Sequence, residues 1–243
     1  MRQTRRRSPI RALAVLVTLA LPASAGAAAE PTAGAPLAGG PTVAHWAHAA
    51  HTAAVRSLPS QASQQIARLH YLTEDGFPEV YPVLRRFKAR GGTAWLRIQI
   101  PARRRGRTGW VRDFALGPLY RVRTRLVVDR GLLRATLFHA GRRIWQSAIG
   151  VGKPGTSTPA GRFWIREKFK VADPDGPYGP NAFGTSGYSR LSDWPGGGVV
   201  GIHGTDQPNL VPGRPSHGCI RVPNEAVIRL YRLMPIGTPM QVL

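Results

Sequence analysis

The segment RPSHGCIRV, residues 214–222, contains the single cysteine of this 243-residue chain. Cys219 directly follows a histidine and a glycine and lies two positions before Arg221. A cysteine becomes a nucleophile when a nearby base takes the thiol proton and an oxyanion site stabilises the charge formed on the attacked carbonyl. The neighbours of Cys219 are of the types that this chemistry requires, so the segment predicts a cysteine nucleophile.

Two histidines are candidates for the base. His217 lies two residues before Cys219, where the short, rigid link makes an in-line hydrogen bond difficult. His203, in GIHGTDQ, ends a predicted strand, and a loop rich in proline and glycine then returns the chain to Ser216. Such a loop places two strand ends side by side, so we expect His203 to be the base.

Gly218 and Arg221 complete the predicted site. Gly218 carries no side chain, which leaves the approach to the thiol open and lets backbone N–H groups face a reacting carbonyl. The guanidinium of Arg221 is suited to pairing with a carboxylate of the substrate.

Other interpretations of these residues are open. Cys219 is a core residue in the first, although only Ile220 beside it is strongly apolar. In the second, His203, His217 and Cys219 bind zinc with Asp206 as the fourth ligand, although this spacing is not a standard zinc pattern. In the third, the proximity of a histidine and a cysteine is coincidental.

Residues 122–243 supply the elements that must position this site. Asp-Arg-Gly and Ala-Gly turns separate segments that predict consecutive strands: TRLVVD, LLRATLFHAG, RRIWQSAIGVG and GRFWIREKFKV. Asn224 is the expected N-cap of a helix with apolar residues at helical spacing from Val227 to Met234, stopped by Pro235. The fold class is therefore mainly β, with one main helix.

Residues 64–118 carry a second β pattern. Short segments rich in β-branched and aromatic residues are separated by the turn signals EDG, ARGG and RRRGRTG. Their spacing predicts a small barrel of the SH3 type, and RTGWVRD is similar to the Gly-Trp-Val strand of bacterial SH3-like domains. We expect Trp95 and Trp110 in the core, and the region to serve as a binding module or as a brace for the next domain.

The N-terminal residues predict export. Residues 1–27 combine five arginines, an apolar run too short for a permanent membrane span, and Ala-x-Ala cleavage sites, as a secretory signal peptide does. Residues 28–63 are an Ala/Pro/Gly-rich linker by composition. His45, His48 and His51 would share one face of a helix there, but no cysteine or acid accompanies them and we assign them no metal.

The charge indicates an anionic partner. The formal net charge is +22, and removal of the five leader arginines would leave +17. For an exported protein this surplus favours anionic cell-wall polymers, whereas export and the scattered arginines argue against nucleic acid. The single cysteine excludes an intramolecular disulfide.

The residues from His203 to Val222 resemble the signature of the L,D-transpeptidase family, whose catalytic fold is named YkuD. That signature is a His-Gly pair, a variable loop and then the pattern that Ser216–Arg221 matches. A second motif of the family, which ends in Thr-Pro-x-Gly-x-Phe, is matched at residues 152–163. The resemblance covers residues 122–243 and implies a β-rich L,D-transpeptidase catalytic domain, preceded here by the SH3-like region.

The resemblance implies acyl transfer on peptidoglycan stem peptides. Cys219 would attack the carbonyl of the third stem residue and release the terminal D-alanine as a thioester forms. His203 would take the thiol proton, and the backbone carbonyl of Gly204 would orient its imidazole. His217 and the amides of Gly218 and Cys219 would line the oxyanion site.

The side-chain amine of a second stem would then resolve the thioester and form a 3→3 cross-link. Water in its place would make the protein an L,D-carboxypeptidase, and a non-catalytic wall-binding protein is a further alternative. Arg221 and Ser216 are expected to bind substrate. Tyr188, in the Pro- and Gly-rich segment 171–189, is expected to help close the site. The expected partners are stem peptides as acyl donor and acceptor, with no metal, organic cofactor, nucleic acid or stable membrane span, in the cell wall or periplasm.

Overall fold

A computed structural model describes residues 34–37, 39–40, 42–103, 106–191 and 195–243. The signal peptide predicted at residues 1–27 lies outside this part of the chain. The described residues belong to one compact unit, which contains three β-sheets and one α-helix. None of their helices has the length and apolar character that crossing a membrane requires.

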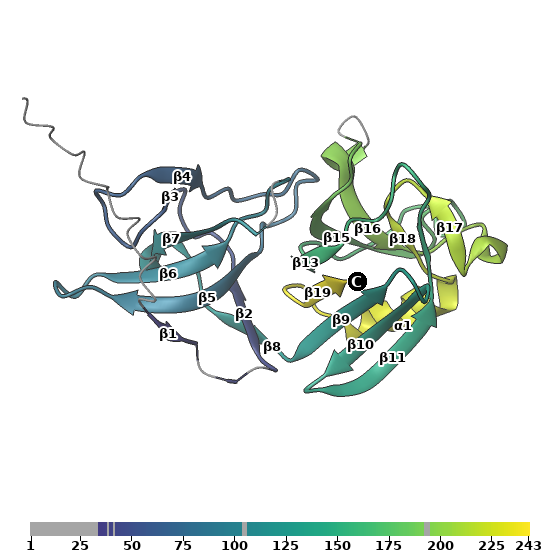
Figure 1. Ribbon diagram of the computed structural model, residues 1–243, viewed down its shortest axis with the longest axis horizontal. Helices are drawn as coiled ribbons and strands as arrows, with labels where there is room; N and C mark the ends of the chain where they lie inside the picture. The colour runs from purple at the N-terminus through teal and green to yellow at the C-terminus, as the bar shows by residue number, and fades with distance from the viewer. Residues whose placement is uncertain (1–33, 38, 41, 104–105, 192–194) are drawn as a thin grey trace, which may run out of the picture. The chain divides into compact units, whose positions relative to one another are not determined.

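The first sheet is antiparallel and has eight strands in the order β4-β3-β7-β6-β5-β2-β8, with β1 also paired to β5 (Figure 1). Its strands are β1 (Ala35–Pro36), β2 (Ala44–Ala47), β3 (Ala54–Arg56), β4 (Gln65–Arg68), β5 (Tyr81–Lys88), β6 (Ala94–Gln99), β7 (Thr108–Arg112) and β8 (Tyr120–Val122). We call it the N-terminal sheet.

The N-terminal sheet begins earlier in the sequence than predicted. The linker expected at residues 28–63 is wrong for β2 and β3, because Ala47 and Val55 are fully buried inside the sheet. Their small and β-branched side chains pack there despite the Ala-rich composition that suggested a linker. Trp95 and Trp110 are buried, which confirms them as core residues. The SH3-type barrel remains a prediction.

The three N-terminal histidines do not share a helix face. His45 lies in β2, and the ring of His48 donates from Nδ1 to the backbone carbonyl of Glu79 at 2.8 Å. The ring of His51 packs edge-on against Phe114 at a centroid distance of 6.1 Å. The shared helix face considered for these histidines does not form, because this stretch contains no helix and each ring has a separate environment.

Two further sheets and one helix form the C-terminal part. The five-stranded sheet has the order β11-β10-β9-β19-β13, and the six-stranded sheet has the order β14-β15-β16-β18-β12-β17. Their strands are β9 (Thr124–Asp129), β10 (Arg134–His139), β11 (Arg142–Ala148), β12 (Gly150–Gly152), β13 (Gly161–Trp164), β14 (Phe169–Lys170), β15 (Asn181–Tyr188), β16 (Val199–His203), β17 (Gly213–Ser216), β18 (Ile220–Arg221) and β19 (Pro239–Val242). The predicted strands and the mainly β fold class are confirmed.

One hydrophobic core joins these two sheets to the helix α1 (Asn224–Leu233). Leu137 from the five-stranded sheet, Phe183 and Ile220 from the six-stranded sheet, and Leu230 from the helix are each 1% exposed or less. Burial of each such side chain stabilises the fold by about 1.5–3 kcal/mol. The strands that carry the predicted site are thus held on a rigid base.

The helix has the predicted apolar face but a different N-terminal cap. Pro223 precedes the helix, and the carboxamide oxygen of Asn224 accepts the amide hydrogen of Thr205 at 2.8 Å. The predicted N-cap was wrong because this tertiary hydrogen bond occupies the side chain. The bond ties α1 to the segment that follows His203.

The segment at residues 171–189 is only partly a loop. Its second half is β15, which lies between β14 and β16 and is almost entirely buried. The prediction of a loop throughout was wrong because Gly184, Thr185, Ser186 and Gly187 are small enough to pack inside the sheet. The residues before β15 form the exposed loop, and they include Tyr178.

Candidate active site

Cys219 lies in a tight turn after β17 and directly before the start of β18, the strand that runs parallel to β16. The register pairs Ile202 with Ile220 and His203 with Arg221. Gly201, one residue before this pairing, donates its amide hydrogen to Sγ of Cys219 at 3.4 Å. The two strand ends lie side by side as the returning loop predicts.

His203 points to the same place as Cys219. A Cβ built on Gly201 would stand 3.7 Å from Sγ of Cys219 and 3.7 Å from Cδ2 of His203. Nδ1 of His203 lies 2.7 Å from the carbonyl oxygen of Gly204. A carbonyl only accepts, so Nδ1 carries the proton and Nε2 keeps its lone pair. This tautomer is the one that a general base needs.

Burial sets the charge state of the histidine. His203 is 5% exposed, and this burial lowers its pKa to about 4. The hydrogen bond to Gly204 opposes the shift, and the positive charge of Arg221 adds to it. The imidazole is therefore neutral at pH 7 and able to accept a proton.

The thiol is also held in its neutral form. Burial raises the pKa of Cys219, while the amide of Gly201 and the guanidinium of Arg221 lower it in part. A neutral thiol beside a neutral imidazole transfers its proton as the sulfur attacks a carbonyl. The amide of Gly201 and the charge of Arg221 are in place to stabilise the thiolate at that moment.

Buried hydroxyl groups fix the turn that carries Cys219. Ser216 donates to the carbonyl of Cys219 at 2.6 Å and accepts the amide hydrogen of Gly218 at 3.2 Å. Thr158, from the second family motif, donates to the carbonyl of Gly218 at 2.8 Å and accepts from the amide of Gly152 at 2.9 Å. Gly218 has a φ of +128°, a region in which side chains are strained.

These bonds bear on three predicted roles. Ser216 is 2% exposed, and its hydroxyl holds the turn that carries Cys219. Direct contact between Ser216 and a substrate stays a prediction. The amide of Gly218 donates to the hydroxyl of Ser216, and the oxyanion role of Gly218 stays a prediction. His217 is held through its backbone, whose carbonyl accepts from the hydroxyl of Ser189 at 3.1 Å. The oxyanion role of His217 stays a prediction.

Arg221 lies between the site and the returning loop. Its Nη1 donates to the side-chain oxygen of Gln207 at 3.0 Å, and its Nε is buried without a hydrogen-bond partner in the described structure. The guanidinium acts on both reactive groups electrostatically, since it lowers the pKa of His203 and of Cys219. Pairing with a substrate carboxylate stays a prediction.

A cleft of about 410 Å³ opens on the thiol and the imidazole. Tyr178 lies at its edge and meets the ring of His203 edge-on, with centroids 4.9 Å apart. Phe77, from the N-terminal sheet region, stacks on Phe169 at 5.3 Å. The cleft is thus built by both halves of the described chain and can hold a peptide beside the thiol. Its lining is Asp75, Phe77, Glu167, Phe169, Val171, Tyr178, Ala182, Phe183, Gly184, Val199, Gly201, His203 and Cys219.

Tyr188, the predicted closing residue, lies in a different environment. Its hydroxyl donates to Glu74 and accepts from Arg166, and the guanidinium of Arg103 lies over its ring at 5.3 Å. The residue lines a separate hollow with Ser189. The structure places Tyr178 at the catalytic cleft, and the closing role of Tyr188 stays a prediction.

The zinc and core interpretations do not fit this geometry. Within the described ranges, no group of three or more histidine, cysteine, aspartate or glutamate side chains is arranged to hold a metal ion. Asp206 is exposed, whereas His203 is buried. Cys219 lines the cleft and is not enclosed in the hydrophobic core.

The fold and the site define one class of catalytic domain. Residues 123–242 match the model of the YkuD family, described as the L,D-transpeptidase catalytic domain. The match confirms over these residues the resemblance to the YkuD family of L,D-transpeptidase catalytic domains that the two motifs predict.

Two curated relatives come from Bacillus subtilis. The putative L,D-transpeptidase YkuD is 33% identical over 119 residues, which are 49% of this chain and 65% of the relative. The putative L,D-transpeptidase YqjB is 30% identical over 101 residues, which are 37% of this chain and 54% of the relative. The chain therefore spans between about half and two thirds of the length of these relatives.

Solved structures with similarity to the chain include L,D-transpeptidases. A crystal structure of a cysteine-to-serine mutant of the Enterococcus faecium L,D-transpeptidase is 31% identical, covers 49% of each chain and has a TM-score of 0.39. A crystal structure of an L,D-transpeptidase from Mycobacterium tuberculosis is 14% identical, covers 62% of this chain and 90% of that one, and has a TM-score of 0.41.

Proposed function

We propose that the protein is a peptidoglycan L,D-transpeptidase with Cys219 as its nucleophile. The observation that carries the proposal is the arrangement of three groups at one strand end. The Cys219 thiol receives an amide hydrogen bond, His203 is a neutral base nearby, and Gly204 fixes the tautomer of that base. This set performs acyl transfer without a metal or an organic cofactor.

In the first half-reaction the donor is a stem tetrapeptide. The sulfur of Cys219 attacks the carbonyl carbon of the third residue as Nε2 of His203 takes the thiol proton. The bond from that carbon to the nitrogen of the terminal D-alanine then breaks, and His203 returns the proton to the leaving amine. The products are a thioester on Cys219 and free D-alanine.

In the second half-reaction a side-chain amine from another stem attacks the thioester carbon. The carbon–sulfur bond breaks, His203 takes a proton from the attacking amine, and the thiol is restored. The result is a 3→3 cross-link. Attack by water would give an L,D-carboxypeptidase from the same thioester, and a non-catalytic wall-binding protein would form no thioester at all.

The test is intact-protein mass spectrometry after incubation with a carbapenem, a strained acyl donor. We expect one adduct per chain on the parent protein, no adduct on Cys219→Ala, and an adduct that forms at least 100-fold more slowly on His203→Ala. A folded parent protein that forms no adduct would reject the proposed nucleophile. Incubation with a stem tetrapeptide then separates a transpeptidase, which gives a dimer, from a carboxypeptidase, which gives only tripeptide.

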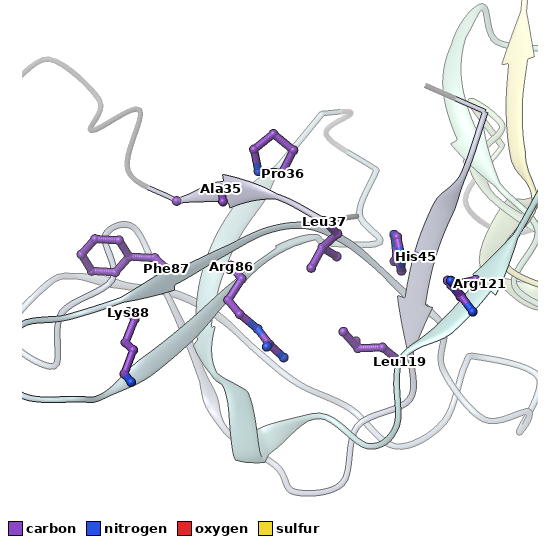
Figure 2. Close-up of a pocket in the computed structure, with 10 residues that line it drawn as sticks. Ala35, Pro36, Leu37, His45, Arg86, Phe87, Lys88, Leu119 and Arg121 are labelled. Atoms are coloured by element: carbon purple, nitrogen blue, oxygen red, sulfur yellow. The ribbon is translucent and has the colours of Figure 1, made fainter. Parts of the chain in front are cut away.

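The second proposed partner is an anionic wall polymer, which agrees with export through the leader at residues 1–27. The N-terminal sheet has a hollow of about 620 Å³. Figure 2 shows Arg86 of β5, His45 of β2 and Arg121 of β8 among the residues that line it. Burial, and then the charge of Arg121, lowers the pKa of His45. The net charge of +22 and these guanidiniums favour a polymer of phosphates or carboxylates.

A further inference from the structure

One wall of the catalytic cleft is acidic in a strongly basic chain. Of the 12 acidic residues in the sequence, four lie together around this wall: Glu74, Asp75, Glu79 and Glu167. Asp75 and Glu167 line the same cleft as His203 and Cys219. The remaining two carboxylates hold the adjacent guanidinium of Arg166.

Glu167 is buried without a matching cation. It is 2% exposed, and its Oε1 has no hydrogen-bond partner among the described residues. Burial raises the pKa of Glu167 most, and Asp75 and Glu74 raise it further, whereas Thr73 and Arg166 lower it. A positively charged group that enters the cleft would stabilise the ionised form of this buried carboxyl.

The strand pairing sets an upper limit on the distance between the carboxylate of Glu167 and Sγ of Cys219. Gly184 and Gly201 are directly paired across β15 and β16. A Cβ on Gly184 would overlap the carboxylate of Glu167, and a Cβ on Gly201 would stand 3.7 Å from Sγ of Cys219. Paired residues of antiparallel strands face the same side with Cβ atoms about 5 Å apart, so the carboxylate lies within about 11 Å of the sulfur.

This distance matches the donor stem. When Cys219 is bonded to the carbonyl of the third stem residue, a four-carbon side chain of that residue extends about 6 Å from its Cα. Its terminal amine can then reach Glu167 across the two glycines. The amine of the acceptor must instead approach the thioester carbon itself, at the sulfur.

We propose that Glu167, assisted by Asp75 at the cleft rim, binds the side-chain ammonium of the diamino acid at position three of the donor stem. This inference rests on the proposed transpeptidase function and names the group that selects its donor. It assigns a specificity role to a wall that the N-terminal sheet region completes through Asp75 and through the Phe77–Phe169 contact.

The test compares two synthetic stem tetrapeptides as substrates of the full-length chain. One has lysine at position three, and the other has Nε-acetyllysine, which is neutral. We expect kcat/KM of the parent protein for thioester formation to be about 10- to 100-fold higher with the lysine peptide than with the acetyllysine peptide. This factor is typical of the loss of one buried charged hydrogen bond. Glu167→Gln should show only the slower rate and should not discriminate between the two peptides.

Three controls separate the outcomes. Carbapenem acylation of the parent protein and of Glu225→Gln, which lies outside the cleft, reports whether the reactive thiol is intact, since the carbapenem probe does not depend on a side-chain ammonium. Glu225→Gln, an exposed substitution on α1, should retain full discrimination. Dependence on acceptor concentration, measured from the preformed acyl-enzyme, shows whether a defect of Glu167→Gln lies in the donor step or in the acceptor step.

A parent protein that reacts with the carbapenem but uses both tetrapeptides equally would overturn the inference, even if Glu167→Gln failed to fold. A defect of Glu167→Gln confined to the acceptor step would assign the ammonium to the acceptor stem and overturn the donor assignment. A parent protein that the carbapenem does not acylate would instead overturn the proposed function itself.

Discussion

Arg166 and Glu79, which lie 87 positions apart in the sequence, form a buried ion pair between the C-terminal part and the N-terminal sheet region. Nε of Arg166 donates to Oε1 of Glu79 at 2.8 Å, and Nη2 donates to Oε2. Both residues are 2% exposed. Trp164 adds a second connection, since its indole N–H donates to the carbonyl of Val80 at 2.8 Å. These bonds hold the loop that carries Asp75 and Phe77 against the cleft.

Removing Glu79 should therefore be strongly destabilising. Glu79→Ala leaves the guanidinium of Arg166 buried, with the half-exposed Glu74 as its remaining ion-pair partner and the hydroxyl of Tyr188 as a further hydrogen-bond acceptor. We expect the free energy of unfolding to fall by about 3–5 kcal/mol, as for other broken buried pairs. Denaturant titration of the full chain measures the effect, with the exposed Glu225→Gln as the control. A loss below 1 kcal/mol would show that the pair does not hold the two parts together.

The low pKa of His203 predicts a stability that depends on pH. The group has a pKa of about 4 when folded and an ordinary value of 6.5, so the unfolded chain binds more protons between these two values. Stability should be fully present above pH 6.5 and should fall as the pH drops toward 4, by up to about 3 kcal/mol. His203→Gln should remove this part of the dependence in chemical denaturation at pH 4.5, 5.5 and 7.

The lowered pKa of His203 also predicts how the acylation rate depends on pH on the acid side. Because His203 stays neutral down to about pH 4, carbapenem acylation should hold its rate from pH 7 to pH 5, where an ordinary histidine would already be protonated. Tyr178→Ala removes the ring that covers His203 and should move the acid limb to higher pH. An acid limb near pH 6.5 in the parent protein would contradict the buried, neutral base.

The sequence predicts that the proposed nucleophile and base meet, because their signals are local or lie at two strand ends joined by one rigid loop. Cys219 and His203 follow this rule, and the alternating strands around them follow the period of side chains along a strand. The acidic wall was not predictable, because Asp75 and Glu167 meet only through the tertiary contact of two sheets. Asn224 shows the same limit, since a capping preference is local and the amide of Thr205 that uses its side chain is not.

Gly184 and Gly201, which are paired across β15 and β16, should respond differently to substitution by alanine. A Cβ on Gly184 would overlap the carboxylate of Glu167, so Gly184→Ala should destabilise the fold by about 1–3 kcal/mol. A Cβ on Gly201 would make ordinary contacts of 3.5–3.7 Å, so Gly201→Ala should fold with nearly unchanged stability. The added methyl of Gly201→Ala would nevertheless stand beside Cys219 and His203 and slow acylation. Thermal unfolding and carbapenem adduct formation, measured on both variants, should show this separation, and equal stability losses would contradict it.

Thr158 offers a test of how the catalytic turn is held. Its hydroxyl joins the amide of Gly152 to the carbonyl of Gly218, and the residue is 1% exposed. Thr158→Val keeps the shape but leaves both backbone groups buried without a partner, so we expect a loss of about 2–4 kcal/mol in the free energy of unfolding. Acylation of Cys219 should slow as well, because Gly218 keeps its positive φ only while the turn is held in place. Thr158→Ser restores the hydroxyl and should recover most of the acylation rate while losing only the packing of one methyl group. If Thr158→Val and Thr158→Ser acylate at the same rate, the hydroxyl does not position the nucleophile.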